Sequence, residues 1–443
     1  MAGSNKRSYS TKANVFVIIE RFLAQEAHSG ILLFGAALVA ILWANSPWSG
    51  SYFELWHTPL GIEFGQHIVD LSLNHWINDA LMAIFFLLIG LEIKRELLVG
   101  ELSSIQKAAF PFIAAIGGML FPALIYSAVN LQPSGNINGF GIPMATDIAF
   151  VLGFLLILGK RVPLALKIFI TSLAVVDDLG SIIIIALFYS SSIDLAFLGY
   201  AVIPLAFLIL LNVTGIRKLW PYLLAGIALW ILFELSGIHA TIAGVLLALT
   251  IPVRSRIDPQ QFMGICGMEL AAFRECELGR KSILLTQRQQ NALENLEDSY
   301  DAVQNPLVRL EHRLHPISAF LVLPLFALAN AGVQISGSSI SFLSPASLGI
   351  ILGLMLGKPL GVIGFTYLAD RLGWAKKPDN LSWKHIIGAG ILAGVGFTMS
   401  IFITHLAFSE PDKIAAAKLT ILVCSLAMGI IGTASLFWAS QKK

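Results

Sequence analysis

The sequence predicts an all-α protein that crosses a membrane about twelve times, and three observations carry this prediction. Only 13 % of the 443 residues are charged, where an average soluble domain carries roughly 25 %. Hydrophobic residues make up 56 % of the chain, and the mean hydropathy is +0.78. The basic residues are concentrated in alternate loops between apolar segments. An ordinary soluble enzyme is excluded, because a soluble fold of this size has too much surface to cover with so few charges.

The apolar segments are taken as helices because a helix of about 20 residues crosses the roughly 30 Å of hydrocarbon in a bilayer. The twelve segments lie at residues 29–45, 77–98, 108–130, 139–157, 165–189, 195–213, 219–234, 238–252, 316–334, 346–369, 386–405 and 414–439. With both termini cytoplasmic, 26 of the 29 Lys and Arg fall on the cytoplasmic side. The positive-inside rule therefore favours this topology, with one membrane domain over residues 1–443.

Two segments are expected to lie outside the bilayer. Residues 46–76 form an outer loop in which two aromatic-rich stretches flank a Pro-Leu-Gly turn, so a small β-hairpin is expected. Residues 253–315 form a long cytoplasmic loop. Its apolar residues recur at spacings of three and four, which predicts an amphipathic helix with one apolar seam, broken near Pro306. The seam comprises Leu293, Leu296, Tyr300, Val303, Leu307, Leu310 and Leu314.

Composition also limits the partners. The net charge is only +2, which gives no indication of a nucleic-acid partner. The three cysteines are too few, and wrongly spaced, for a disulfide framework or a zinc site. No cofactor is predicted.

Four ionisable residues lie deep within the predicted spans: Asp147, Asp177, Asp178 and Lys358. At 1.5 Å per residue, each lies near the middle of the bilayer. Each charge costs about 2.5–3.5 kcal/mol to insert, so a functional role is expected. One structural ion pair explains a single Asp with Lys358, but it leaves two acids unexplained. The sequence therefore predicts an ion or proton site at the midplane.

The chemistry of adjacent carboxylates suits exchange of protons for a metal cation. Asp177 and Asp178 diverge by about 100° on a helix, so one can face a partner while the other faces a cavity. A medium of low dielectric favours the protonated form of a carboxylate, whereas carboxylate oxygens also bind hard cations. Protons and a small cation would compete for such a site.

Two spans carry signs of interruption. The fourth reads GFGIPMATDIAFVLG, with Pro143 and a run of small residues, and the eleventh reads GAGILAGVGFTMSIF. Spans 3–5 and 10–12 are three-helix sets entered from opposite sides, which predicts inverted-topology repeats with discontinuous helices in spans 4 and 11. Asp147 is then expected to compensate helix N-termini, and Lys358 helix C-termini.

These motifs identify a family. PMATDIAF, LAVVDDLGSI, GKPLGV and GVGFTMS resemble the NhaA family of bacterial sodium/proton antiporters, as do WINDALMAIFFLLIGLEIKREL and LEHRLHPISAFLVLPLFALANAGV. The resemblance covers most of the chain outside residues 1–14 and 253–305. It implies an electrogenic, pH-regulated exchanger of Na⁺ or Li⁺ for H⁺, a multi-pass protein of the bacterial inner (plasma) membrane that works by alternating access.

The resemblance also implies residue roles. Asp178 is the main ligand of the transported sodium ion, with Asp177 beside it, and Asp177 pairs with Lys358 until the cation binds. Thr146 and Asp147 lie where the broken helices cross. A homodimer forms through the outer loop 46–76.

A cytoplasmic pH-sensing cluster is also implied. It maps onto Glu92, Lys94, Glu96, Glu311, His312 and His315. The alternative interpretation is that Glu92, Lys94 and Glu96 are ordinary solvated charges at the cytoplasmic end of a helix. His239, at the outer end of a span, is a further candidate because histidine titrates near neutral pH.

Two other functions fit part of the pattern. An intramembrane aspartyl protease needs two Asp from separate helices that share a proton. However, no Gly-x-Gly-Asp motif is present, and Lys358 would disturb the shared proton. A passive cation channel would also use buried acids, although interrupted helices favour alternating access.

Overall fold

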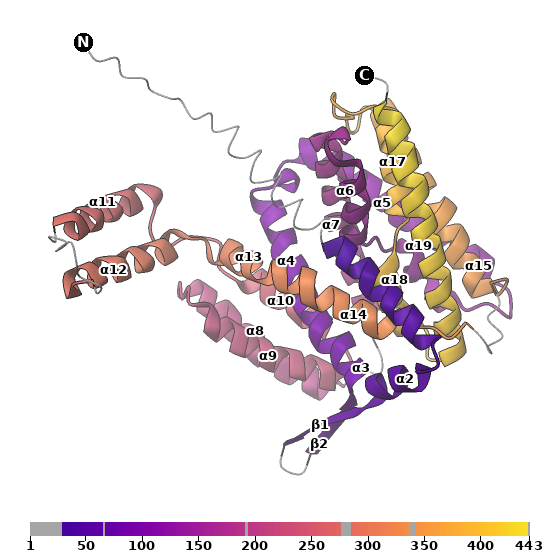
Figure 1. The fold of residues 1–443 in the computed structure, drawn as a ribbon, viewed down its shortest axis with the longest axis horizontal. Helices are drawn as coiled ribbons and strands as arrows, with labels where there is room; N and C mark the ends of the chain where they lie inside the picture. Colours follow the sequence, from indigo (N-terminus) through magenta and orange to yellow (C-terminus); the bar gives the residue numbers. More distant parts are fainter. Residues whose placement is uncertain (1–28, 65–66, 191–193, 276–284, 336–341, 442–443) are drawn as a thin grey trace. The chain divides into compact units, whose positions relative to one another are not determined.

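The computed structural model describes residues 29–64, 67–190, 194–275, 285–335 and 342–441, and these residues are mostly helical (Figure 1). The described chain divides into two compact units. Unit 1 contains residues up to 85, together with 96–192 and 316–443, and unit 2 contains residues 86–95 and 193–315. Helix α4, Met82–Leu98, contributes to both units.

Unit 1 carries most of the long helices. The first described helix of unit 1 is Ser29–Ala44, and the other helices of this unit follow it in the chain. Its helices are α2 Ser49–His57, α3 Leu73–Trp76, α5 Ile105–Asn130, α6 Ile148–Leu158, α7 Leu164–Phe188, α14 Leu323–Asn330, α15 Pro345–Leu352, α16 Lys358–Leu372, α17 Trp383–Ala393, α18 Phe397–Ala407 and α19 Pro411–Ser440. Its 3₁₀ segments are η2 Glu101–Ser103, η3 Ile137–Met144 and η4 Gly159–Arg161, and its π-helical turns are η1 Ile77–Leu81, η5 Ser318–Val322 and η6 Gly353–Gly357.

The membrane-spanning character predicted from the sequence is confirmed. Within the described residues, nine helices are long and apolar enough to cross a membrane, or up to eleven if each of two bent pairs is one span. Every predicted span contains helix, but α10, Thr241–Thr250, has only ten residues. At 1.5 Å per residue it covers about 15 Å, half the thickness of the hydrocarbon core.

Two strands lie in the segment 46–76. β1, Pro59–Phe64, pairs antiparallel with β2, His67–Ser72, and Pro59 lies opposite Ser72. The helix before them is held to unit 1 by Tyr52, whose hydroxyl donates to the carbonyl oxygen of Leu328 at 2.8 Å.

Close packing in unit 1 depends on glycines where α5 meets α16. A Cβ added at Gly361 would lie 2.0 Å from the carbonyl oxygen of Gly117, and one added at Gly117 would lie 2.3 Å from that of Gly361. Both distances are far below van der Waals contact, so the two backbones can touch only because these positions lack side chains. This contact fixes the position of the helix that begins at Lys358.

Unit 2 contains two helical hairpins, with further helices between and after them in the chain and residues 86–95 of α4. α8, Leu195–Val213, runs beside α9, Leu219–Ser236, and α11, Pro259–Glu275, runs beside α12, Gln287–Val303 (Figure 1). α10 lies between these hairpins in the chain, and α13, Pro306–Ile317, follows them.

The single apolar seam predicted over residues 293–314 is wrong for α12. The buried positions of α12 are Gln289, Ala292 and Ser299, while Leu293 and Tyr300 are 45 % and 54 % exposed. The reason is that α12 packs against α11, which covers the side of α12 that carries Gln289, Ala292 and Ser299. In α13, Leu307 and Leu310 are buried as the pattern predicts.

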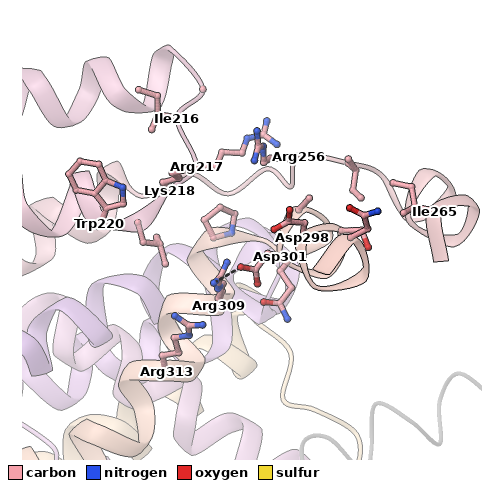
Figure 2. Close-up of a pocket in the computed structure, with 18 of the residues that line it drawn as sticks. Ile216, Arg217, Lys218, Trp220, Arg256, Ile265, Asp298, Asp301, Arg309 and Arg313 are labelled. Atoms are coloured by element: carbon pink, nitrogen blue, oxygen red, sulfur yellow. Dashed lines mark ion pairs between the residues drawn. The ribbon is translucent and has the colours of Figure 1, made fainter. Parts of the chain in front are cut away.

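A cavity of about 1240 Å³ lies in unit 2 between the α8–α9 connection and the α11–α12 hairpin. Five of its lining residues are basic, and they come from three segments: Arg217, Lys218, Arg256, Arg309 and Arg313. Figure 2 shows the ion pair that Arg309 makes with Asp301 in this cavity, at 2.7 Å.

Candidate functional site

The candidate site lies in unit 1, where two helical segments lose their regular structure. Residues 145–147 are extended between η3 and α6, and residues 394–396 separate α17 from α18, with a bend of 42°. The Asp147 amide donates to the carbonyl oxygen of Val395 at 2.8 Å, so the two interruptions contact each other. A Cβ at Gly394 would lie 2.5 Å from the carbonyl oxygen of Leu354, which explains the glycine there.

Asp147 closes the N-termini of two helices. Its Oδ1 accepts a hydrogen bond from the Phe150 amide at 3.0 Å, which caps α6. Its Oδ2 accepts one from the Thr398 amide at 3.0 Å, at the start of α18, and the Thr398 hydroxyl also donates to it. A carboxylate suits this place, because unpaired amides and the helix dipoles favour negative charge at N-termini.

Lys358 and Asp177 form a fully buried ion pair. Lys358 Nζ lies 3.0 Å from Asp177 Oδ2, and neither side chain has any exposed surface. Lys358 also donates to the carbonyl oxygen of Met144, the last residue of η3. The positive charge therefore lies at the C-terminal end of a helical segment, where the dipole favours it.

Thr146 joins the ion pair to the second interruption. Its hydroxyl lies 2.7 Å from Asp177 Oδ2 and 3.1 Å from the carbonyl oxygen of Ala393, the last residue of α17. A hydroxyl has a single proton, so these two acceptors compete for it. If Asp177 no longer accepted this hydrogen bond, the Thr146 hydroxyl would donate to the Ala393 carbonyl oxygen at the end of α17.

Asp178 and its neighbour Asp177 each have one carboxylate oxygen without a hydrogen-bond partner among the described residues. Both residues are buried, and the oxygen is Oδ1 in each. The carboxyl group of Asp178 interacts electrostatically with Asp177, Asp147 and Lys358. Buried carboxylate oxygens that lack donors are the atoms a cation would bind.

The residues predicted to sense pH are spread through unit 2, apart from Glu96. Lys94 Nζ donates to the carbonyl oxygens of Leu249 and Ile251 at 2.6 and 2.5 Å, at the end of α10. The single Nε–H of Arg95 is shared between the two carboxylate oxygens of Glu311, at 2.9 and 3.1 Å. Arg95 is the partner that the sequence interpretation missed.

The remaining members of this set differ in their surroundings. Glu92 and His315 are buried, whereas His312 lines a second cavity next to Arg309. Glu96, in unit 1, accepts a hydrogen bond from the Glu101 amide at 2.9 Å. His239 contacts the Thr241 hydroxyl at 3.1 Å, at the opposite end of α10 from the Lys94 contact.

Interrupted apolar helices that meet over buried acids and a buried lysine are typical of a secondary ion transporter. The comparisons with known proteins agree with this class. The model of the family described as Na+/H+ antiporter 1 matches residues 20–436.

Relatives named Na(+)/H(+) antiporter NhaA align with nearly the whole chain. The one from Wolinella succinogenes is 49 % identical over 428 residues, 97 % of this chain and 94 % of that protein. The one from Helicobacter pylori (strain G27) is 50 % identical over 435 residues, 96 % of this chain and 97 % of that protein. The chain therefore belongs to the NhaA family of sodium/proton antiporters. It is a multi-pass membrane protein and a secondary transporter, not an enzyme.

Proposed function

We propose that this protein exchanges Na⁺ or Li⁺ for H⁺ across the inner membrane, with both ions competing for Asp177 and Asp178. The observation that carries the proposal is the pair of buried carboxylate oxygens without hydrogen-bond partners, next to an ion pair that a cation can disrupt. In the proton-loaded form, one proton neutralises Asp178 and another is held by Lys358, which is paired with Asp177. In the sodium-loaded form, Na⁺ replaces them.

Lys358 couples the two forms in this proposal. A sodium ion bound between Asp178 and Asp177 competes with Lys358 for Asp177, because both are cations that need the same oxygen. When the 3.0 Å ion pair breaks, Thr146 also loses its acceptor on Asp177. We propose that this rearrangement at the two interruptions changes which side of the membrane the site faces. Two acids and one lysine are enough titratable groups to carry more protons than sodium ions across the membrane in each cycle. We propose that the exchange therefore moves net charge, which makes it electrogenic.

We propose further that transport is regulated by cytoplasmic pH through unit 2. The support is that Lys94, Arg95 and Glu311 join α4 to α10 and α13 by charged groups. His312, His315, Glu92 and Glu96 are the other proposed members, and His239, at the opposite end of α10, is proposed as a separate pH-sensing residue. Both termini are proposed to be cytoplasmic from the distribution of Lys and Arg; residues 1–28 and 442–443 lie outside the described residues.

The proposed homodimer forms through residues 46–76. In the described part of the chain, β1 and β2 pair only with each other, so each has an outer edge that a second copy can extend. Deletion of residues 59–72 would leave a monomer on native mass spectrometry if this proposal is right. A dimer that persists would contradict it.

The experiment that tests the exchange uses purified protein in liposomes with an internal pH dye and an imposed proton gradient. Addition of Na⁺ or Li⁺ is expected to collapse the gradient, and Asp178→Asn is expected to abolish the response. Sodium flux without proton movement would show a passive channel instead. Full activity of Asp178→Asn would contradict the assignment of the ion site.

A further inference from the structure

Helix α7 carries a third buried oxygen without a partner, one turn beyond the two acids. The hydroxyl of Ser181 has no hydrogen-bond partner among the described residues, and the residue is 2 % exposed. Ser181 is the i+4 neighbour of Asp177 and the i+3 neighbour of Asp178. Side chains at these spacings lie next to each other on a helix surface. The three unpartnered oxygens are therefore grouped on one side of α7.

Among the described residues, Ser181 is the one serine or threonine whose buried hydroxyl oxygen lacks a hydrogen-bond partner. In helices, Ser and Thr hydroxyls commonly donate to a carbonyl oxygen one turn earlier. Thr171, in the same helix, does so to Lys167 at 2.6 Å, and Thr366 does so to Val362 at 2.7 Å. Ser181 does not make this bond, so its oxygen is buried at a cost in free energy that nothing in the described residues offsets.

This grouping supports a role in ion binding rather than in packing. Na⁺ is a hard cation, and such cations take neutral oxygens together with carboxylates. A hydroxyl offers lone pairs to a cation and can still donate its proton to a neighbouring carboxylate. Alanine would fill the same place without burying a polar atom, so packing alone does not explain serine.

We propose that the Ser181 hydroxyl is a further ligand of the transported cation and that it favours Na⁺ over Li⁺. The inference rests on the proposed site at Asp177 and Asp178 and extends it by one turn of α7. Selectivity between cations of the same class depends on cavity size and the number of ligands. Na⁺, the larger ion, accommodates more ligands than Li⁺, so loss of one ligand weakens Na⁺ binding more.

The test compares Ser181→Ala with the unchanged protein in proteoliposomes. The Na⁺ concentration for half-maximal exchange is expected to rise roughly tenfold, which corresponds to a loss of about 1.4 kcal/mol of binding free energy, with little change in maximal rate. The Li⁺ concentration for half-maximal exchange should rise less, so the ratio of the two values shifts toward Li⁺. Ser181→Thr keeps a hydroxyl and should retain the original preference.

A second readout separates ligation from a structural role. Ser181→Ala should leave the melting temperature without Na⁺ unchanged or higher, because it removes an unsatisfied hydroxyl. It should reduce the rise in melting temperature that Na⁺ produces. The matched control is Ser172→Ala, a buried serine of α7 whose position is about 140° around the helix from Asp177. This variant should behave like the unchanged protein in both assays.

The outcomes separate failure of this inference from failure of the proposed function. If the unchanged protein exchanges ions but Ser181→Ala has the same Na⁺ and Li⁺ dependence, Ser181 is not a ligand. A uniform loss of rate with an unchanged ion preference would also overturn the inference, since it would indicate a packing defect. If the unchanged protein does not exchange ions, the proposed function itself fails.

Discussion

Two ion pairs of similar length serve different purposes in this protein. Lys358 and Asp177 in unit 1 are 3.0 Å apart and have no exposed surface. Arg309 and Asp301 in unit 2 are 2.7 Å apart, but they are 25 % and 42 % exposed. Breaking the shorter pair, Arg309 with Asp301, is expected to cost less folding free energy, because water and ions screen its attraction. The comparison shows that desolvation, rather than the distance between the charges, determines the free energy needed to bury each charge. It also determines how much stability is lost when one charge is removed.

The surroundings of the two pairs differ in the same way. In unit 1, Lys358, Thr146 and Asp147 each bond to a group at the end of a helical segment, so the charges hold the interruptions together. In unit 2, Arg309 and Asp301 line an open cavity beside other charged side chains. Loss of a charge can be compensated by water there, but not at the buried pair.

Removal of Lys358 is expected to have the largest effect. Lys358→Ala leaves Asp177 buried without its counter-ion, and breaking a buried pair in this way costs about 3–5 kcal/mol of folding free energy. The melting temperature in detergent should fall, and exchange should be lost. The double variant Lys358→Ala with Asp177→Asn should recover most of the stability but not the exchange. Unchanged melting of the single variant would refute the structural role of Lys358.

Substitution of Asp147 should have an intermediate effect that depends on the replacement. Asp147→Ala removes the acceptors for the starts of α6 and α18, which at about 1 kcal/mol per cap amounts to about 2 kcal/mol. Asp147→Asn keeps one acceptor oxygen and should cost about half as much. Denaturation of both variants in the same detergent gives the ranking. Equal losses would show that the carboxylate does not cap both helices.

Substitution at the exposed pair should have the smallest effect. Asp301→Ala is expected to change stability by about 0.2–1 kcal/mol, as for other solvent-exposed pairs. It should leave the Na⁺ dependence of exchange unchanged. The check is a double-mutant cycle with Arg309→Ala, carried out at low and at high salt. A coupling as large as that at Lys358 would mean that burial does not distinguish the two regions.

The features that the sequence predicts best are those that local patterns determine. Apolar length predicts the spans, and the small residues near Pro143 and Gly394 predict the two interruptions. The charges of Asp147, Asp177, Asp178 and Lys358 stand out because they are costly in an apolar segment.

Contacts between distant parts of the chain could not be predicted in the same way. Thr398 donates to Asp147 across 251 positions, and Arg95 pairs with Glu311 across 216. No periodicity encodes such pairs. The inward face of α12 was also missed, because its neighbour α11 determines which side is covered. The sequence indicates the proposed role of Ser181 only weakly. Its spacing from the two acids can be read from the sequence, but the absence of a hydrogen-bond partner for its hydroxyl cannot.

The central claim is that protons and Na⁺ occupy the same buried carboxylates, and Na⁺-induced proton release tests it most directly. Addition of Na⁺ to the purified protein in weakly buffered detergent solution should release protons, because the cation displaces them. Asp178→Asn should release none under the same conditions. Proton release from Asp178→Asn equal to that of the unchanged protein would contradict the account.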